Sequence, residues 1–239
     1  MKKLIIIPAF NEASNIERVI DNLTENYPEY DYVIVNDGSS DDTASLCMEK
    51  GYEVINLPIN LGIGGAVQCG YRYALRNGYD IAIQMDGDGQ HDPKFLDEIT
   101  AVIERGEADC VVGSRFINKE GFQSSGSRRM GISILSTLGL ILTGVRIRDI
   151  TSGYRAVDKK LIAIFANDYP VDYPEPEAMI IASINRCRIV EYPVIMKERE
   201  SGVSSINFKK SVYYMVKVTI SMIIRRISLG FRRTKGHKE

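Results

Sequence analysis

Two carboxylates separated by a single glycine are the clearest chemical feature of the chain. The segment Met85–Pro93 reads MDGDGQHDP and contains Asp86, Gly87 and Asp88 in succession. Because Gly87 has no side chain, both carboxylates can face one small volume. Two ionised carboxylates at close range are unfavourable unless a cation lies beside them. Mg²⁺ and Mn²⁺ prefer such oxygen ligands and leave positions for phosphate oxygens of a substrate. The pair therefore predicts a divalent-metal site formed by Asp86 and Asp88.

Two other polar motifs follow short apolar runs in the same way. Pro8–Glu12 reads PAFNE and Val35–Thr43 reads VNDGSSDDT. Either motif alone is typical of an ordinary acidic or glycine-rich turn. The segment Leu61–Gly65 is also glycine-rich, but it lacks the Lys and Ser/Thr of a P-loop. We interpret it as a close-approach turn that opens a helix near a phosphate or ribose.

These motifs need a scaffold that brings them together, and the hydrophobic pattern predicts one. Short apolar or β-branched runs at Lys3–Ile7, Tyr32–Asn36, Glu53–Leu57, Ile81–Met85 and Cys110–Gly113 indicate strands, and Gly153–Val157 and Ile189–Ile195 indicate two more. Helical periods separate the strands. The first begins at Ile16 after a capping box at Ser14 and Glu17, and others cover 41–50, 65–77, a segment after Pro93, a segment up to about Thr143, and 177–185. We expect a loop at Ser124–Arg129.

Alternating strands and helices predict an α/β fold with a mainly parallel, Rossmann-like sheet covered on both faces. In such sheets ligands bind beyond the carboxyl ends of the strands. The three polar motifs fall at those ends, so we expect them to converge on one pocket.

Composition limits the class of protein. The 239 residues are 44% hydrophobic and 26% charged, which is typical of a globular protein and excludes collagen-like, low-complexity and disordered chains. The net charge of −1 conceals a division, because residues 207–239 contain nine Lys or Arg and one acid. That segment carries +8 and residues 1–206 carry −9. We therefore divide the chain into a domain at 1–206 and a basic C-terminal helix and tail at 207–239.

Cysteines and apolar segments add expectations about the compartment. Cys47, Cys69, Cys110 and Cys187 form no CxxC pair and have largely apolar neighbours, as expected for free thiols. The apolar segment 132–145 is too short to span a bilayer, and charges interrupt the segment 212–230. Tyrosines without interleaved basic residues predict no nucleic-acid partner.

Several motifs together resemble one family. PAFNE, VNDGSSDDT and MDGDGQHDP are joined by NLGIGGA (60–66), GSRF (113–116), DITSGYRA (149–156), PEPE (174–177) and RESGVSSI (199–206). In this order they resemble the family 2 glycosyltransferases of the GT-A fold, over the chain up to about residue 206. The subgroup that they are most similar to is that of the dolichyl- and polyprenyl-phosphate sugar synthases.

The resemblance implies a role for each matching residue. Nucleotide and donor binding would fall to Pro8, Phe10, Glu12, Val35, Asp37, Asp86, Gly87, Gln90, Arg115 and Arg199. Asp37 would lie near the base, and Gln90 near the donor sugar or acceptor phosphate. Arg115 and Arg199 would contact phosphates, because a guanidinium offers bidentate recognition. Glu175 and Glu177 would lie on the acceptor side. Two positions depart from the family pattern, since Ile63 and Ser205 stand where lysine is frequent.

The family inverts the anomeric centre, so the resemblance implies that an acceptor oxygen attacks opposite a leaving nucleoside diphosphate. Asp88 is the leading catalytic metal ligand, with Mg²⁺ or Mn²⁺ as cofactor. A lipid phosphate is already anionic and needs little help from a base, whereas a sugar hydroxyl needs a carboxylate. Glu177 is the first candidate for that base and Asp149 the second. His91 is either a further metal ligand or a structural residue of its turn.

Alternatives remain open at this point. The acceptor is a polyprenyl phosphate or a glycan hydroxyl, and the donor a UDP- or GDP-sugar. A silent nucleotide-sugar-binding subunit is less consistent with Asp86, Asp88, Arg115 and Arg199 occurring together.

The basic tail is open to three interpretations. On a helical wheel Val212, Val216, Thr219, Ile223 and Ile227 share one face, and Lys210, Lys217, Ser221, Arg225 and Ser228 the other. The helix would pack on its own domain, lie on an anionic membrane surface, or bind a small membrane subunit. We expect a cytoplasmic protein peripherally associated with the inner face of the cell membrane.

Overall fold

The structure is a computed structural model, and it describes residues 1–121, 126–172, 174–197 and 208–235. Its strands are β1 (Lys3–Ala9), β2 (Asp31–Asn36), β3 (Val54–Asn56), β4 (Ile81–Gln84), β5 (Cys110–Ser114), β6 (Arg155–Asp158) and β7 (Ile189–Pro193). Its helices are α1 (Ile16–Asn26), α2 (Thr43–Glu49), α3 (Gly62–Arg76), α4 (Leu96–Glu104), α5 (Gly126–Thr143), α6 (Lys159–Asn167), α7 (Pro174–Ile184) and α8 (Phe208–Lys235), and a 3₁₀ turn, η1 (Pro93–Phe95), precedes α4.

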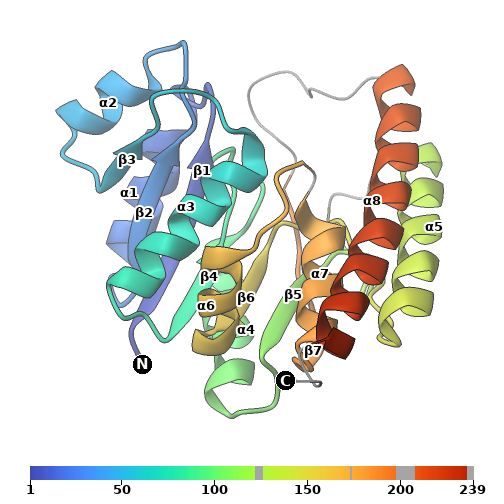
Figure 1. Ribbon diagram of the computed structural model, residues 1–239. Coiled ribbons are helices and arrows are strands. Elements are labelled where there is room, and N and C mark those ends of the chain that lie inside the picture. The colour runs from blue at the N-terminus through green and yellow to red at the C-terminus, as the bar shows by residue number, and fades with distance from the viewer. Residues whose placement is uncertain (122–125, 173, 198–207, 236–239) are drawn as a thin grey trace.

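The strands form one sheet in the order β3-β2-β1-β4-β6-β5-β7. All neighbouring pairs are parallel except those of β6, which runs antiparallel between β4 and β5. Figure 1 shows the sheet between two layers of helices, with α5 and α8 side by side beyond α7. The expected α/β class and mainly parallel sheet are confirmed.

Alternate residues of each strand point to the two faces and build two cores. Ile5 and Ile7 of β1 pack with α1, α2 and α4, whereas Leu4 and Ile6 pack with α3, α6 and α7. Gly70 of α3 lies against the sheet, where an added Cβ would come within 2.2 Å of Ile6 Cγ2. Near-continuous apolar strands are therefore required, because both faces are covered.

The predicted strands all form, but helix α6, one loop and the start of helix α1 differ from the expectation. Helix α6 was not predicted, although Asp158 caps it by accepting a hydrogen bond from Leu161 N at 2.9 Å. Of the loop expected at Ser124–Arg129, residues 126–129 are helical, because α5 begins at Gly126, and residues 124 and 125 lie outside the described residues. The four cysteines are free thiols, as expected.

The predicted capping box at Ser14 and Glu17 is wrong. Helix α1 begins at Ile16 after Asn15, and no side chain caps it. Instead, Glu12 holds the entry turn, since its carbonyl accepts from Asn15 N and Ile16 N at 2.9 Å each. The Glu17 carboxylate is drawn away into an ion pair with Lys50.

Helix α8 packs on α5 and α7, but with a different face than a helical wheel suggests. Among its described side chains, those of residues 215–228, Val218 and Met222 are buried, at 1% and 0% exposure. Lys217 and Arg225, predicted to face away from the apolar side, point toward the body of the protein and form ion pairs there. An apolar stripe stays exposed, and it consists of Val216, Ile220, Ile223, Ile224 and Ile227.

Candidate functional site

Three parallel strands end at one edge of the sheet, and the polar motifs follow them there. Residues pair along β1 and β2 from Leu4↔Asp31 to Ala9↔Asn36, and β1 also pairs with β4. Their carboxyl ends therefore lie together, and Asp37 N donates to Ala9 O at 2.8 Å. The turn at Gly87 lies against Pro8, because an added Cβ would be 3.4 Å from Pro8 O. The three motifs therefore lie together at this edge of the sheet, as expected.

The PAFNE segment lies at this edge and contacts the VNDGSSDDT motif. Asn11 adopts a left-handed conformation with φ 57°, and its Oδ1 accepts from Ser40 N at 2.9 Å. Glu12 N donates to Thr43 Oγ1 at 3.0 Å, which ties the first motif to the second. Pro8 and Val35 are buried within their strands, whereas Phe10 is 48% exposed at the rim. Phe10 is therefore accessible for contact with a ligand.

Asp37 follows β2 and contacts the glycine-rich turn. Its Oδ1 accepts from Leu61 N at 2.7 Å, and its carbonyl accepts from Asn60 Nδ2 at 3.0 Å. Burial raises the pKa of this carboxyl. Gly38 has φ +65°, and an added Cβ would lie 2.8 Å from Asn60 N. A glycine is therefore required for the VNDGSS turn to approach the glycine-rich turn so closely.

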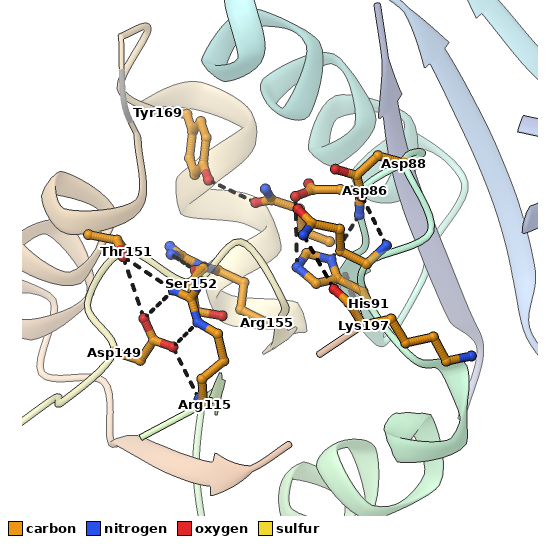
Figure 2. A network of polar contacts seen from close by, with 12 residues as sticks. Asp86, Asp88, His91, Arg115, Asp149, Thr151, Ser152, Arg155, Tyr169 and Lys197 are labelled. Carbon is orange, nitrogen blue, oxygen red and sulfur yellow. Dashed lines mark hydrogen bonds and ion pairs between the residues drawn. The ribbon is translucent and has the colours of Figure 1, made fainter. Parts of the chain in front are cut away.

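The Asp86–Asp88 turn is held from within by His91. The Asp86 N–H donates to His91 Nδ1 at 3.0 Å, which places the ring proton on Nε2. That atom lies 3.7 Å from Asp86 Oδ2 (Figure 2). The ring stacks on Tyr154 at 4.9 Å, and burial lowers the pKa of His91 to about 4, so the ring is neutral at pH 7. His91 therefore has the structural role in its turn.

The donor set at this turn fits a hard divalent cation in part. Asp86 and Asp88 contribute carboxylate oxygens, and Asp88 uses Oδ1 to accept from Gln90 N at 3.0 Å. Within the described ranges, no group of three or more His, Cys, Asp or Glu is arranged to hold a metal. Mg²⁺ and Mn²⁺ commonly take one or two carboxylates together with substrate phosphates, which is the composition that this turn offers.

Gln90 connects the turn to the strand-end region after β7. Its side chain donates to Lys197 O at 3.3 Å, and its carbonyl accepts from Lys197 N at 2.9 Å. Residue 197 is the last one described before position 208, so the predicted phosphate contact Arg199 lies outside the described residues.

Arg115 and Asp149 form a buried, bidentate ion pair. Arg115 Nε and Nη2 donate to Asp149 Oδ2 and Oδ1 at 2.7 Å each, and Arg115 N also donates to Oδ2 at 3.1 Å (Figure 2). Asp149 is fully buried, and Arg115 is 8% exposed. The carboxylate that was the second candidate for a base is thus occupied in fixing the guanidinium.

Glu177, the first candidate for a base, faces helix α8. It lines a cavity beneath α8 together with Ser221 and Arg225, and burial raises its pKa. Glu175 also belongs to the first turn of α7. Burial raises the pKa of Glu175, and both Arg155 and Asp86 act on it electrostatically. Of the two glutamates in PEPE, Glu175 is therefore the one near the carboxylate turn.

Sequence reasoning missed several residues beneath the site. Arg155 is fully buried in β6 and donates to Ser152 O at 2.7 Å and to Glu175 O at 3.4 Å. Gln84, opposite it in the register, accepts from Tyr169 OH at 3.3 Å (Figure 2). The antiparallel insertion of β6 brings these residues together, and no local pattern indicates that pairing. A charged residue inside an apolar strand was the one available signal.

Among helices of the described ranges, none is both long and apolar enough to cross a bilayer.

Comparisons with known proteins agree with this architecture. Residues 4–165 match the family described as glycosyl transferase family 2. The polyprenol monophosphomannose synthase of Mycolicibacterium smegmatis is 31% identical over 91% of this chain and 85% of its own length. The undecaprenyl-phosphate mannosyltransferase of Micrococcus luteus is 31% identical over 87% of this chain and 88% of its own.

A solved structure gives the corresponding match in three dimensions. Glucosyl-3-phosphoglycerate synthase from Mycobacterium tuberculosis, in complex with Mn²⁺, UDP and its product, superposes with a TM-score of 0.68 at 19% identity. The match covers 94% of this chain and 79% of the other. At this identity the likeness establishes the shared fold alone.

Proposed function

Because the chain belongs to glycosyl transferase family 2, we propose that it moves a sugar from a nucleotide-sugar donor to a polyprenyl phosphate, with inversion. The chain is a glycosyltransferase with a GT-A fold. The proposal concerns the finer points, namely the acceptor, the metal and the membrane. Two relatives are named as a polyprenol monophosphomannose synthase and an undecaprenyl-phosphate mannosyltransferase. Their names support a lipid phosphate as the acceptor class.

The observation that carries the acceptor assignment is the orientation of the two predicted bases. Asp149 is bound to Arg115 through both of its oxygens, and Glu177 faces Ser221 and Arg225 of α8. The remaining glutamate near the turn, Glu175, lies beside the buried Arg155, which favours its ionised form as a partner of that guanidinium. A sugar hydroxyl would need a carboxylate to take its proton. A phosphate acceptor is already ionised and needs none. The arrangement of both carboxylates therefore favours a phosphate.

The donor would lie along the edge formed by Asp37, Asp86 and Asp88. Asp37 and Phe10 would hold the nucleoside, and Arg115, already oriented by Asp149, would meet a phosphate. A Mg²⁺ or Mn²⁺ ion held by Asp86 and Asp88 would offset negative charge on the leaving diphosphate. The acceptor phosphate oxygen would form the new bond to the anomeric carbon while the bond to the nucleoside diphosphate breaks.

The exposed apolar stripe of α8 supports association with a membrane. Beside it, α5 exposes Met130, Ile134 and Ile141, at 66%, 54% and 74%. Contiguous exposed apolar surface on a folded protein marks an interaction site. A polyprenyl chain stays in the bilayer, so the enzyme would work at the inner face of the cell membrane. An anionic lipid surface also suits the +8 charge of residues 207–239.

The choice between phosphate and hydroxyl acceptors can be tested with Glu177→Gln. If the acceptor is a phosphate, turnover with undecaprenyl phosphate stays within about threefold of the native value, because no proton must be removed. If Glu177 instead removes the proton of a glycan hydroxyl, turnover with a glycan acceptor falls by roughly a hundredfold or more. Nucleoside diphosphate release under saturating Mn²⁺ measures both outcomes, and the second would overturn the proposal.

A further inference from the structure

Residues 168–172, which we call the bridging loop, join α6 to α7 and touch the glycine-rich turn. Gly64 N donates to Val171 O at 3.1 Å. A Cβ added at Gly64 would lie 2.0 Å from Pro170 O, so only glycine permits this approach. The start of α3 is thereby fixed against the bridging loop.

The same glycine-rich turn holds Asp37. Leu61 N donates to Asp37 Oδ1 at 2.7 Å, three residues before the contact of Gly64 with Val171. A shift of the bridging loop would thus move a turn that lies directly against the proposed nucleoside site.

A second contact joins the bridging loop to the carboxylate turn. Tyr169 is 5% exposed, and its hydroxyl donates to Gln84 Oε1 at 3.3 Å (Figure 2). Gln84 ends β4, two residues before Asp86. The bridging loop therefore contacts both halves of the proposed donor site, one through Val171 and the other through Tyr169.

Helix α8 holds the bridging loop at both of its ends. Lys217 Nζ lies 2.6 Å from Asp172 Oδ2, and Arg225 pairs with Asp168. The two cations are eight residues apart, about 12 Å along the helix. A cavity of about 270 Å³ lies among the bridging loop, Glu177 and α8. The two ion pairs therefore flank a space that is not filled by side chains.

We propose that Lys217 and Arg225 are positioning residues for donor binding, acting through the bridging loop on the turns at Asp37 and Asp86. The proposal rests on the function proposed above, in which a nucleotide sugar binds at that edge. The helix that carries both cations also carries the exposed apolar stripe. Membrane contact and donor binding therefore share one structural element.

Isothermal titration of the full chain with UDP and with GDP, in MnCl₂ and without lipid or acceptor, tests this proposal. Part-exposed ion pairs contribute about 0.2–1 kcal/mol, so Lys217→Met and Arg225→Met should each weaken binding by roughly up to fivefold. The double variant should weaken it by roughly tenfold. Arg225→Lys should bind within about twofold of the native chain, because it keeps the charge.

Arg188→Met is the matched control. It removes an exposed arginine that pairs with Asp109 at 2.8 Å on another edge of the protein, so it changes the net charge equally. Nucleotide affinity should stay at the native value. In turnover assays, the variants of α8 should raise the donor KM with little change in kcat, which a general loss of folded protein would not do.

Exchanging the charges of one pair guards against a folding defect. Lys217→Asp with Asp172→Lys keeps the net charge and should restore the affinity that Lys217→Asp alone loses. Native-like nucleotide affinity in the double methionine variant, or an equal loss in Arg188→Met, would overturn the positioning role. Absence of binding of both nucleotides to the native chain would instead refute the proposed function.

Discussion

Individual residues of the site divide into those that a sequence reveals and those that it does not. Asp37, Asp86 and Asp88 are predictable because each follows an apolar strand, and parallel strands end at one edge. The role of His91 is not predictable, since its partner is the backbone N–H of Asp86. A contact between a side chain and a main-chain atom has no signature in residue types.

Replacing Asp88 tests the carboxylate turn most simply. Asp88→Asn keeps the shape but removes the charge that would hold a divalent cation, so transfer should fall by roughly a hundredfold or more at saturating Mn²⁺. Asp80→Asn is the control, because Asp80 precedes β4 at the opposite edge of the sheet. Near-native turnover of Asp88→Asn would show that this residue is not a metal ligand.

The pairing of Arg115 with Asp149 gives a second prediction at this scale. Asp149→Asn leaves a buried guanidinium without its counter-charge, which should lower the free energy of unfolding by about 3–5 kcal/mol in urea titrations. The double variant Arg115→Met with Asp149→Asn removes both charges and should lose less. A single-variant loss below about 1 kcal/mol would mean that water replaces the partner at Arg115.

At the scale of elements, long-range pairing explains what sequence reasoning missed. Strand β6 was expected as a strand, but its antiparallel insertion between β4 and β5 places Arg155 opposite Gln84. Those two residues are 71 positions apart by their numbers in the chain, so no local period reports their contact. Helix α6 is different, since its N-cap Asp158 is a residue type that marks helix starts in a sequence.

The turn that joins β4 to η1 allows a prediction about an element. His91→Phe keeps an aromatic ring on Tyr154 but leaves the Asp86 N–H without its acceptor. An unsatisfied polar group of this kind costs about 1–3 kcal/mol, so the free energy of unfolding should fall by that amount. The concentration of Mn²⁺ needed for half-maximal turnover should rise.

His91→Asn serves as the comparison for the same turn. Its amide oxygen can accept the hydrogen bond of the Asp86 N–H, so part of the lost stability and metal response should return. Identical behaviour of the two variants at position 91 would mean that the hydrogen bond to Asp86 does not position the turn.

For the whole molecule, the distribution of charge and exposed apolar surface is the informative property. A basic tail is evident in the sequence, and the helical wheel places Lys217 and Arg225 on the face opposite the apolar one. In the structure both cations point inward to Asp172 and Asp168, and the isoleucines of α8 face outward. A wheel cannot anticipate which side of a helix finds acidic partners on its own domain.

Cosedimentation with anionic vesicles tests the outward face. Ile224 is 60% exposed on α8, and burial of such a side chain in lipid contributes about 1.5–3 kcal/mol. Ile224→Asp should therefore weaken binding to phosphatidylglycerol vesicles by roughly tenfold or more. Met48→Asp, which changes a 63% exposed residue of α2, is the control and should bind as the native chain does. Equal binding of all three proteins would argue against a membrane face on α8.

The central claim is that a lipid phosphate accepts the sugar without a protein base, and one comparison tests it most directly. Undecaprenyl phosphate and undecaprenol differ only in the phosphate. With Mn²⁺ and a panel of UDP- and GDP-sugars, nucleoside diphosphate release should accelerate strongly with undecaprenyl phosphate and stay at background with undecaprenol. Comparable acceleration by undecaprenol, or by a glycan in the absence of lipid phosphate, would contradict the account.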